Sequence, residues 1–204
     1  MIWPDWSGET AVVLGSGASA RSVAEALPLE RFKVAVTNLS FRLYPQADIL
    51  YAADSGFWQV YRDARKFGGI KASAHDMSHK YVPDVVTVQI PKDQWGRRYE
   101  NMIRRPVGHV GNGLGNSGFQ LVNLVAQLGP ARILLGGLDY CGDHWHGSHP
   151  PSLRNPSEGQ LIKWSKKLDE QATRLAKWGI EVFNLSDNSR LENYERVPRS
   201  RFTT

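Results

Sequence analysis

The chain has 204 residues, of which 41% are hydrophobic and 22% charged, a composition typical of a globular protein with one substantial core. No apolar run approaches the roughly 18 residues of a membrane span, and the first residues lack the basic start and apolar stretch of a signal peptide. A single cysteine, Cys141, excludes an intramolecular disulfide framework. These features predict a cytoplasmic, single-domain protein without a membrane segment.

The formal net charge is +5, but the basic residues are spread along the chain. This spacing is typical of the solvated faces of helices and of a polar tail, so binding of nucleic acid is not favoured. A net positive charge would also attract a phosphorylated small ligand.

Short apolar or β-branched segments alternate with helical segments along the chain. The expected strands span residues 10–14, 32–36, 49–53, 85–90, 132–135 and 181–185. The expected helices span residues 19–27, 57–61, 119–128 and 157–178. This alternation predicts an α/β fold with a mostly parallel sheet flanked by helices. Residues 1–9 are expected to form an arm that packs on the body or on another subunit, 195–204 a polar tail, and 92–118 and 141–156 binding loops or lids.

Two glycine-rich turns each lie before an expected helix, at residues 15–20 (Gly-Ser-Gly-Ala-Ser-Ala) and 111–118 (Gly-Asn-Gly-Leu-Gly-Asn-Ser-Gly). The free N–H groups at such a helix start suit a phosphate or carboxylate, so a nucleotide could lie between the two turns. The alternative is that both are simply tight strand-to-helix connections. Gly15, Gly17 and Ala20 fit a dinucleotide pattern, but Asn38 replaces the acidic residue of an NAD-dependent dehydrogenase.

Polar residues follow several expected strands, at the edge of the sheet where ligands of such folds bind. The candidate nucleotide-binding residues are Gly15, Ser16, Gly17, Ser19, Asn38, Asp54, Asn116, Ser117 and Gly118. Asp54 has a second interpretation as a helix N-cap.

A third group, residues 139–149 (Asp-Tyr-Cys-Gly-Asp-His-Trp-His-Gly-Ser-His), follows a strand directly. Asp139, Asp143 and His144 could bind a transition metal, or Mg²⁺ through the aspartates. His146, His149 and Asp139 are candidate catalytic residues, the histidines as general acid or base. The spacing matches no standard zinc signature, so a plain polar loop stays open as well.

Several short segments together resemble one group of proteins. They are residues 15–19, 37–38, 116–118, 134–139 and 180–186, with Ser189 and Leu191 after the last strand. In this order they are similar to the 6-hydroxymethylpterin diphosphokinase MptE-like proteins and the related bacterial sialyltransferases.

The resemblance implies a Rossmann-like domain that binds a nucleotide or nucleotide-sugar through the first glycine turn, Asn38 and Ser117. It implies one of two activities, pyrophosphoryl transfer from ATP to a pterin with Mg²⁺ or sialyl transfer from CMP-sialic acid without metal. The sialyltransferases place a base histidine before their last helix, and the nearest candidates here are His146 and His149. A small protein of this kind would fit a phage or mobile-element genome.

Three hypotheses follow. The first is a nucleotide- or nucleotide-sugar-dependent transferase with Mg²⁺ as its candidate cofactor, whose donor base and acceptor the sequence leaves open. The second is a non-catalytic nucleotide-binding module, and the third a basic nucleic-acid-binding protein, whose affinity would fall steeply with salt. A homo-oligomer is possible under each of them.

Overall fold

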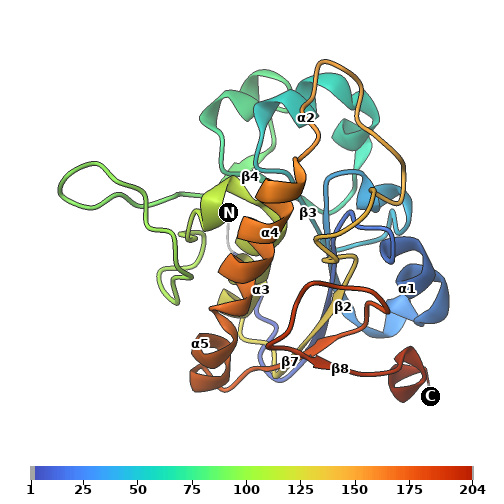
Figure 1. Cartoon of the computed structure of the whole chain (residues 1–204). Helices are drawn as coiled ribbons and strands as arrows, with labels where there is room; N and C mark the ends of the chain where they lie inside the picture. The colour runs from blue at the N-terminus through green and yellow to red at the C-terminus, as the bar shows by residue number, and fades with distance from the viewer. Residues whose placement is uncertain (1–2, 204) are drawn as a thin grey trace.

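In the computed structural model, which describes residues 3–203, eight parallel strands form one sheet (Figure 1). The strands are β1 (Thr10–Leu14), β2 (Lys33–Thr37), β3 (Ile49–Tyr51), β4 (Ile70–Ser73), β5 (Val86–Thr87), β6 (Arg132–Gly136), β7 (Glu181–Asn184) and β8 (Glu195–Arg196). Their order across the sheet is β5-β4-β3-β2-β1-β6-β7-β8. The predicted α/β fold with a parallel sheet is confirmed.

β1 lies at the centre of the sheet, where Val12 is paired with Val34 on β2 and with Leu134 on β6. Side chains alternate between the two faces of a strand, and β1 is buried on both. Ala11 and Val13 join the core on one face, and Val12 and Leu14 join the core on the other. The continuous apolar run that predicted this strand therefore reflects two separate cores.

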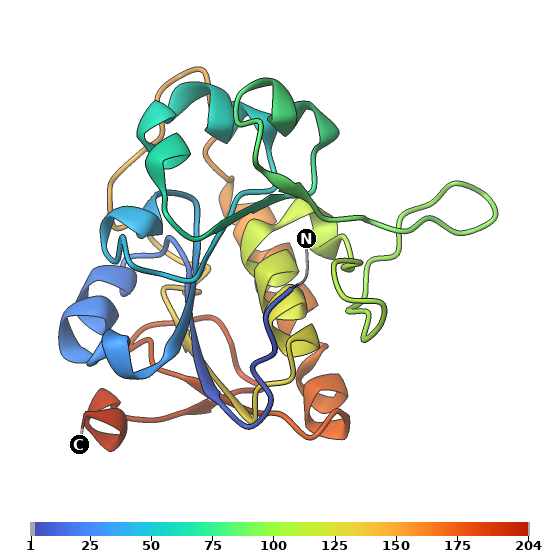
Figure 2. The same cartoon turned by 180° about the vertical axis from the view of Figure 1, so that it is seen from behind.

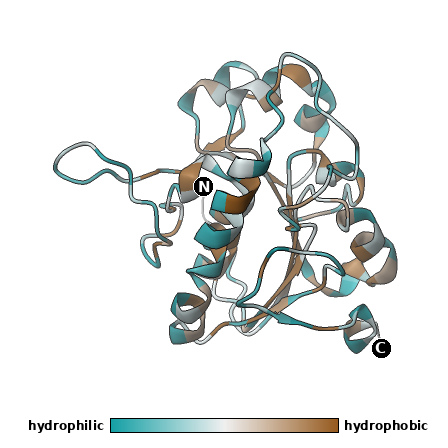
Figure 3. Cartoon of the chain, viewed as in Figure 1, coloured by the Kyte–Doolittle hydropathy of each residue, from teal (hydrophilic) through white to brown (hydrophobic). Residues whose placement is uncertain are grey.

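The helices cover both faces of the sheet (Figures 1 and 2). They are α1 (Ala20–Ala26), α2 (Ser55–Val60), α3 (Ser117–Gln127), α4 (Glu158–Asp169) and α5 (Ala172–Lys177). Side chains of α3, α4 and α5 belong to one core, and side chains of α1 and α2 belong to the other. In Figure 3 hydrophobic residues gather along the sheet, and the outer helix surfaces are hydrophilic.

The structure corrects several expected elements. β4 was not expected, because Lys71 interrupts its apolar pattern; this lysine is buried and pairs with Asp84 at 2.9 Å. The strand expected at 85–90 has only two residues, and the helix expected at 157–178 is divided into α4 and α5. At the division, the buried Gln171 side chain accepts a hydrogen bond from the Met102 N–H at 3.1 Å.

Described residues near both ends of the chain pack onto this body. Trp6, in the expected arm, is buried and its N–H donates to the Leu128 carbonyl at 2.8 Å. The expected polar tail supplies β8 and a 3-10 helix, Arg199–Phe202, with Phe202 against the second core. A loop that begins near Lys92 projects from the body (Figures 1 and 2). Within residues 3–203, no helix has the length and apolar character needed to cross a membrane.

Candidate functional site

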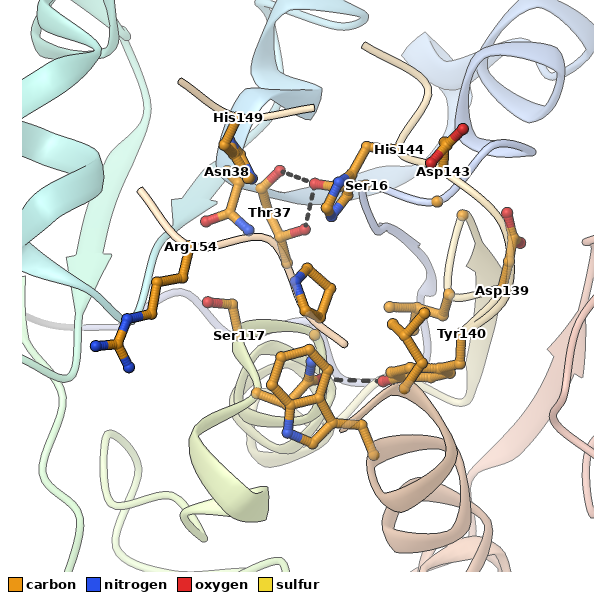
Figure 4. A pocket seen from close by; sticks show the side chains of 18 of the residues that line it. Ser16, Thr37, Asn38, Ser117, Asp139, Tyr140, Asp143, His144, His149 and Arg154 are labelled. Atoms are coloured by element: carbon orange, nitrogen blue, oxygen red, sulfur yellow. Dashed lines mark hydrogen bonds between the residues drawn. The ribbon is translucent and has the colours of Figure 1, made fainter. Parts of the chain in front are cut away.

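A cleft of about 370 Å³ lies beyond the carboxyl ends of the central strands (Figure 4). The chain moves outward from β1 through β5 and then returns to the other side of β1 as β6, so the strand order reverses there. Ligands of open α/β sheets bind at this point. The predicted residues that line the cleft are Ser16, Gly17, Asn38, Asp54, Asn116, Ser117, Gly118, Asp139, Asp143, His144 and His149.

The first glycine turn is held by Asp139, which follows β6. The Ser19 N–H donates to one carboxylate oxygen at 2.8 Å, and the Ser19 hydroxyl donates to the other at 2.5 Å. Asp139 is only 2% exposed. Its negative charge lies at the start of α1, where a carboxylate is stabilised by the helix dipole. The protein's own carboxylate therefore occupies the position at α1 that the sequence suggested for a phosphate.

The glycines of this turn allow close packing against the segment after β6. A Cβ on Gly15 would lie 2.2 Å from the Gly137 carbonyl oxygen, and a Cβ on Gly17 would lie 2.5 Å from an oxygen of Asp139. Gly15 and Ser19 do not line the cleft, although Gly17 does. The close approach that these glycines permit is to the protein itself.

The second glycine turn leaves the start of α3 open. Asn116 caps the helix by accepting a hydrogen bond from the Phe119 N–H at 2.8 Å, and the Tyr140 hydroxyl donates to the same oxygen at 3.0 Å. Within the described residues, the N–H groups of Ser117 and Gly118 donate no hydrogen bond to the protein. Both residues line the cleft, so a helix start with two free donors faces it.

Two polar residues at the carboxyl ends of β1 and β2 form another wall. The Ser16 hydroxyl lies 3.4 Å from both the carbonyl and the hydroxyl oxygen of Thr37. Asn38 follows with φ of 47°, a left-handed conformation that Asn tolerates better than most residues. Figure 4 shows the amide of Asn38 close to this pair and below His149.

Asp54 precedes α2 at the N-cap position, but its side chain accepts no capping hydrogen bond. The carboxyl group therefore stays available in the cleft. Surrounding protein removes part of its hydration and raises its pKa, although the residue keeps an exposed surface, while the nearby His75 acts in the opposite direction.

Three histidines of the loop after β6 form a cluster. The ring centroids of His144, His146 and His149 lie 4.9–5.0 Å apart. Nδ1 of His149 also lies 3.0 Å from the Tyr61 hydroxyl oxygen. Burial lowers the pKa of all three rings, and that of His146 to about 4 with a further contribution from its two neighbours. His144 and His149 line the cleft, whereas His146 does not.

The residues suggested for a metal are arranged differently from the expectation. Within residues 3–203, one potential metal-binding cluster forms, from His144, His146 and His149. One ring nitrogen of each lies within 4.8 Å of the corresponding nitrogens of the other two. Asp139 is engaged with Ser19, and Asp143 is exposed beside His144 (Figure 4). The structure therefore does not bring Asp139, Asp143 and His144 together as a ligand set.

Some cleft residues were not predicted. Arg154 supplies a positive charge from the loop that the sequence marked as a binding loop, and Tyr140 follows Asp139 directly. The charge in a long loop after a strand end was a usable signal for Arg154. Trp164 on α4 also lines the cleft. The sequence carried no signal for this residue, because an aromatic residue on the apolar stripe of a helix is typical of a core.

Comparison with known proteins gives a likeness in structure. No protein-family model and no curated protein matches the sequence. The MAf glycosyltransferase of Magnetospirillum magneticum AMB-1 has a TM-score of 0.64 at 14% identity over 95% of this chain. This chain spans 34% of that longer protein.

The sialyltransferase CstII of Campylobacter jejuni, in complex with the substrate analogue CMP-3FNeuAc, has a TM-score of 0.56 at 13% identity, over 96% of this chain and 88% of that one. A complex of CST-II with CMP and a trisaccharide acceptor gives a TM-score of 0.52 at 14% identity, over 93% and 86%. The chain thus has the Rossmann-like α/β fold found in these glycosyltransferases. The resemblance to the MptE-like proteins stays a prediction.

Proposed function

We propose that this protein is a glycosyltransferase that takes its sugar from a nucleotide-sugar bound in the cleft. The observation that carries the proposal is the open start of α3, where the N–H groups of Ser117 and Gly118 face the cleft without partners among the described residues. Two free donors and the positive end of an 11-residue helix suit the phosphate of a donor. Arg154 adds a positive charge to the same cleft.

The nucleoside part of the donor is assigned to the wall formed by Ser16, Thr37 and Asn38. Asn38 has both a donor and an acceptor in its amide, so it can bind a base edge or a ribose hydroxyl. The structural neighbours in complex with CMP and a CMP-sugar analogue support a nucleotide-sugar as the donor class. Pyrophosphoryl transfer has no comparable support.

Transfer to a hydroxyl group also requires a residue that accepts its proton. The sequence suggested His146 or His149, and of these only His149 lines the cleft. Asp54 lines it too, and its carboxylate makes no capping hydrogen bond. We assign the role of proton acceptor to Asp54, with His149 as the alternative. Asp54→Asn is then expected to lower kcat by about 10²–10⁴-fold with nucleotide affinity retained. His149→Gln is not expected to lower kcat to this extent.

The binding site is tested with Ser117→Pro and the matched control Ser117→Ala. Proline is favoured at the first position of a helix, and Asn116 already has the extended conformation that proline requires before it, with ψ of 120°. Both variants lose the hydroxyl that accepts the Ala53 N–H at 3.1 Å, but only the proline variant loses the N–H donor.

CMP and UDP affinities are measured by calorimetry, together with nucleotide release from CMP-, UDP- and GDP-sugars. Losing one hydrogen bond to a phosphate corresponds to about 10–100-fold weaker binding by Ser117→Pro than by Ser117→Ala. Equal affinities of the two variants would place the phosphate elsewhere. Nucleotide binding without release from any sugar donor would favour the non-catalytic binding module.

A further inference from the structure

The histidine cluster is held in place by bonds from the loop to the body of the protein. The Trp145 N–H donates to the Ser16 carbonyl at 3.1 Å, and its indole N–H donates to the Ser40 hydroxyl at 3.1 Å. Within the loop, the His149 N–H donates to the Asn155 side chain at 2.9 Å. These bonds hold the loop backbone on either side of the cluster.

The cluster leaves ring nitrogens without partners. Nε2 of His146 is buried and has no hydrogen-bond partner among the described residues. The rings of His144 and His146 are stacked with an angle of 7° between their planes. A buried polar atom without a partner costs free energy, and contact between the ring faces does not supply the missing hydrogen bond.

A bound cation would give the unpartnered ring nitrogens of the cluster a common partner. The potential ligand atoms of the three histidines lie within 4.8 Å of one another, close enough for modest ring rotations to direct them at one ion. Imidazole binds a metal ion through a ring nitrogen that carries no proton, so each of the three histidines can supply one neutral ligand.

One ring already has an outer partner. The Tyr61 hydroxyl lies at Nδ1 of His149, which leaves Nε2 of that ring for an ion. Histidine ligands commonly use their second nitrogen in this way, and the outer hydrogen bond fixes the tautomer. Tyr61 follows α2 directly, outside the loop, so it ties the cluster to the body.

We propose that His144, His146 and His149 bind one divalent transition-metal ion of the zinc class. Imidazoles suit Zn²⁺, Co²⁺, Ni²⁺ and Cu²⁺, whereas Mg²⁺ prefers oxygen ligands. Three histidines leave a fourth position open on such an ion, and two of them, His144 and His149, line the cleft. The ion would hold together the loop that lines the cleft. This site goes beyond the proposed glycosyl transfer, and its occupation leaves Asp54 as the proton acceptor.

The test uses the full chain without a histidine tag, stripped of metal by a chelator and titrated with Co²⁺ and Zn²⁺. One Co²⁺ per chain is expected, with the visible absorption of tetrahedral cobalt, displaced by Zn²⁺ but not by excess Mg²⁺. His144→Ala and His149→Ala are expected to weaken binding at least 100-fold. Tyr61→Phe, which removes no ligand, is expected to weaken it about 10–100-fold. His79→Gln, at an exposed histidine outside the cluster, serves as the matched control and should bind as the parent does.

Absence of cobalt binding by the parent overturns the proposal, and so does equal binding by the parent and His144→Ala. Circular dichroism identifies a variant that fails to fold, in which case the Tyr61→Phe result decides. All these measurements omit nucleotides, so they are independent of the proposed transferase activity. Nucleotide binding by a protein that binds no metal would refute this site alone.

Discussion

The starts of α1 and α3 carry the same sequence signal but are used differently. Each follows a glycine-rich turn at the carboxyl edge of the sheet. At α1, Asp139 fills the position of an anion and bonds to Ser19. At α3, Asn116 caps one N–H, and two others, in residues that line the cleft, have no partner in the part of the chain that the structure describes. A glycine-rich turn therefore marks a possible anion site, and only the residue facing it decides whether a ligand can enter.

Two aspartates that follow strands differ in the same way, one engaged by the protein and the other available in the cleft. Asp139 is buried and engaged, whereas Asp54 occupies an N-cap position without a capping bond. One carboxylate supports the fold, and the other is available for chemistry. Substitutions at the two positions separate these roles.

The largest effect is expected from Asp139→Ala. This change removes two hydrogen bonds to a buried carboxyl group and leaves the Ser19 N–H without its partner. We expect the free energy of unfolding to fall by about 2–4 kcal/mol, measured by urea denaturation. Asp54→Ala is the matched control and should change it by less than about 0.5 kcal/mol. Similar losses in both variants would contradict the division of roles.

A smaller loss is expected from Gly17→Ala. The new Cβ would lie 2.5 Å from the Asp139 carboxylate and 2.9 Å from the Gly137 carbonyl, so the turn has to shift. We expect about 1–3 kcal/mol of destabilisation. In Gly159→Ala, in the first turn of α4, the new Cβ would meet no described atom within 4 Å outside its chain neighbours and its own helix backbone, so this change should instead add up to about 0.5–1 kcal/mol. A Gly17→Ala protein as stable as the parent would show that the packing is looser than described.

At α3, stability and binding can be separated with two substitutions of Asn116. Asn116→Ala removes the cap and should cost about 1 kcal/mol. Asn116→Asp keeps an oxygen for the Phe119 N–H, so stability should be maintained, but it adds a negative charge beside the proposed phosphate site. Nucleotide affinity, measured by calorimetry, should therefore fall more in the aspartate variant than in the alanine variant. The reverse order would argue against an anion at α3.

Much of the fold was predictable, because buried parallel strands are continuous apolar runs bounded by glycine or polar residues. The two strands that were missed are those without such a run. β8 consists of the exposed pair Glu195–Arg196, and β4 contains a lysine whose partner, Asp84, lies 13 residues away in the sequence. Such elements form because their neighbours provide an edge or a counter-charge, which a local pattern does not contain.

The site was predictable to a similar degree. The rule that strand ends converge brought most of the candidate residues to one cleft. It could not show that Asp139 bonds to Ser19, which is 120 residues away, or that His146 turns away from the cleft while His149 faces it. These roles depend on distances between segments, and the sequence gives only their order.

The last prediction concerns the pH dependence of transfer and follows from the free carboxylate of Asp54. Loss of hydration raises the pKa of this group, and His75 partly opposes the shift. A proton acceptor is active when deprotonated, so kcat/KM should be constant at higher pH and fall as the pH drops through the raised pKa. The decline should therefore begin above the range of an ordinary aspartate, whose pKa is about 3.9.

His75→Gln sharpens this test, because removing a group that lowers the pKa of Asp54 should move the acidic limb of the kcat/KM profile to still higher pH. His79→Gln carries the same substitution at a histidine of the same short helix and should leave the profile unchanged. Asp54→Asn should remove this limb from whatever activity remains. If the limb persists in Asp54→Asn, or does not shift in His75→Gln, another group accepts the proton, and the carboxylate of Asp54 is not the reacting group although it makes no capping hydrogen bond.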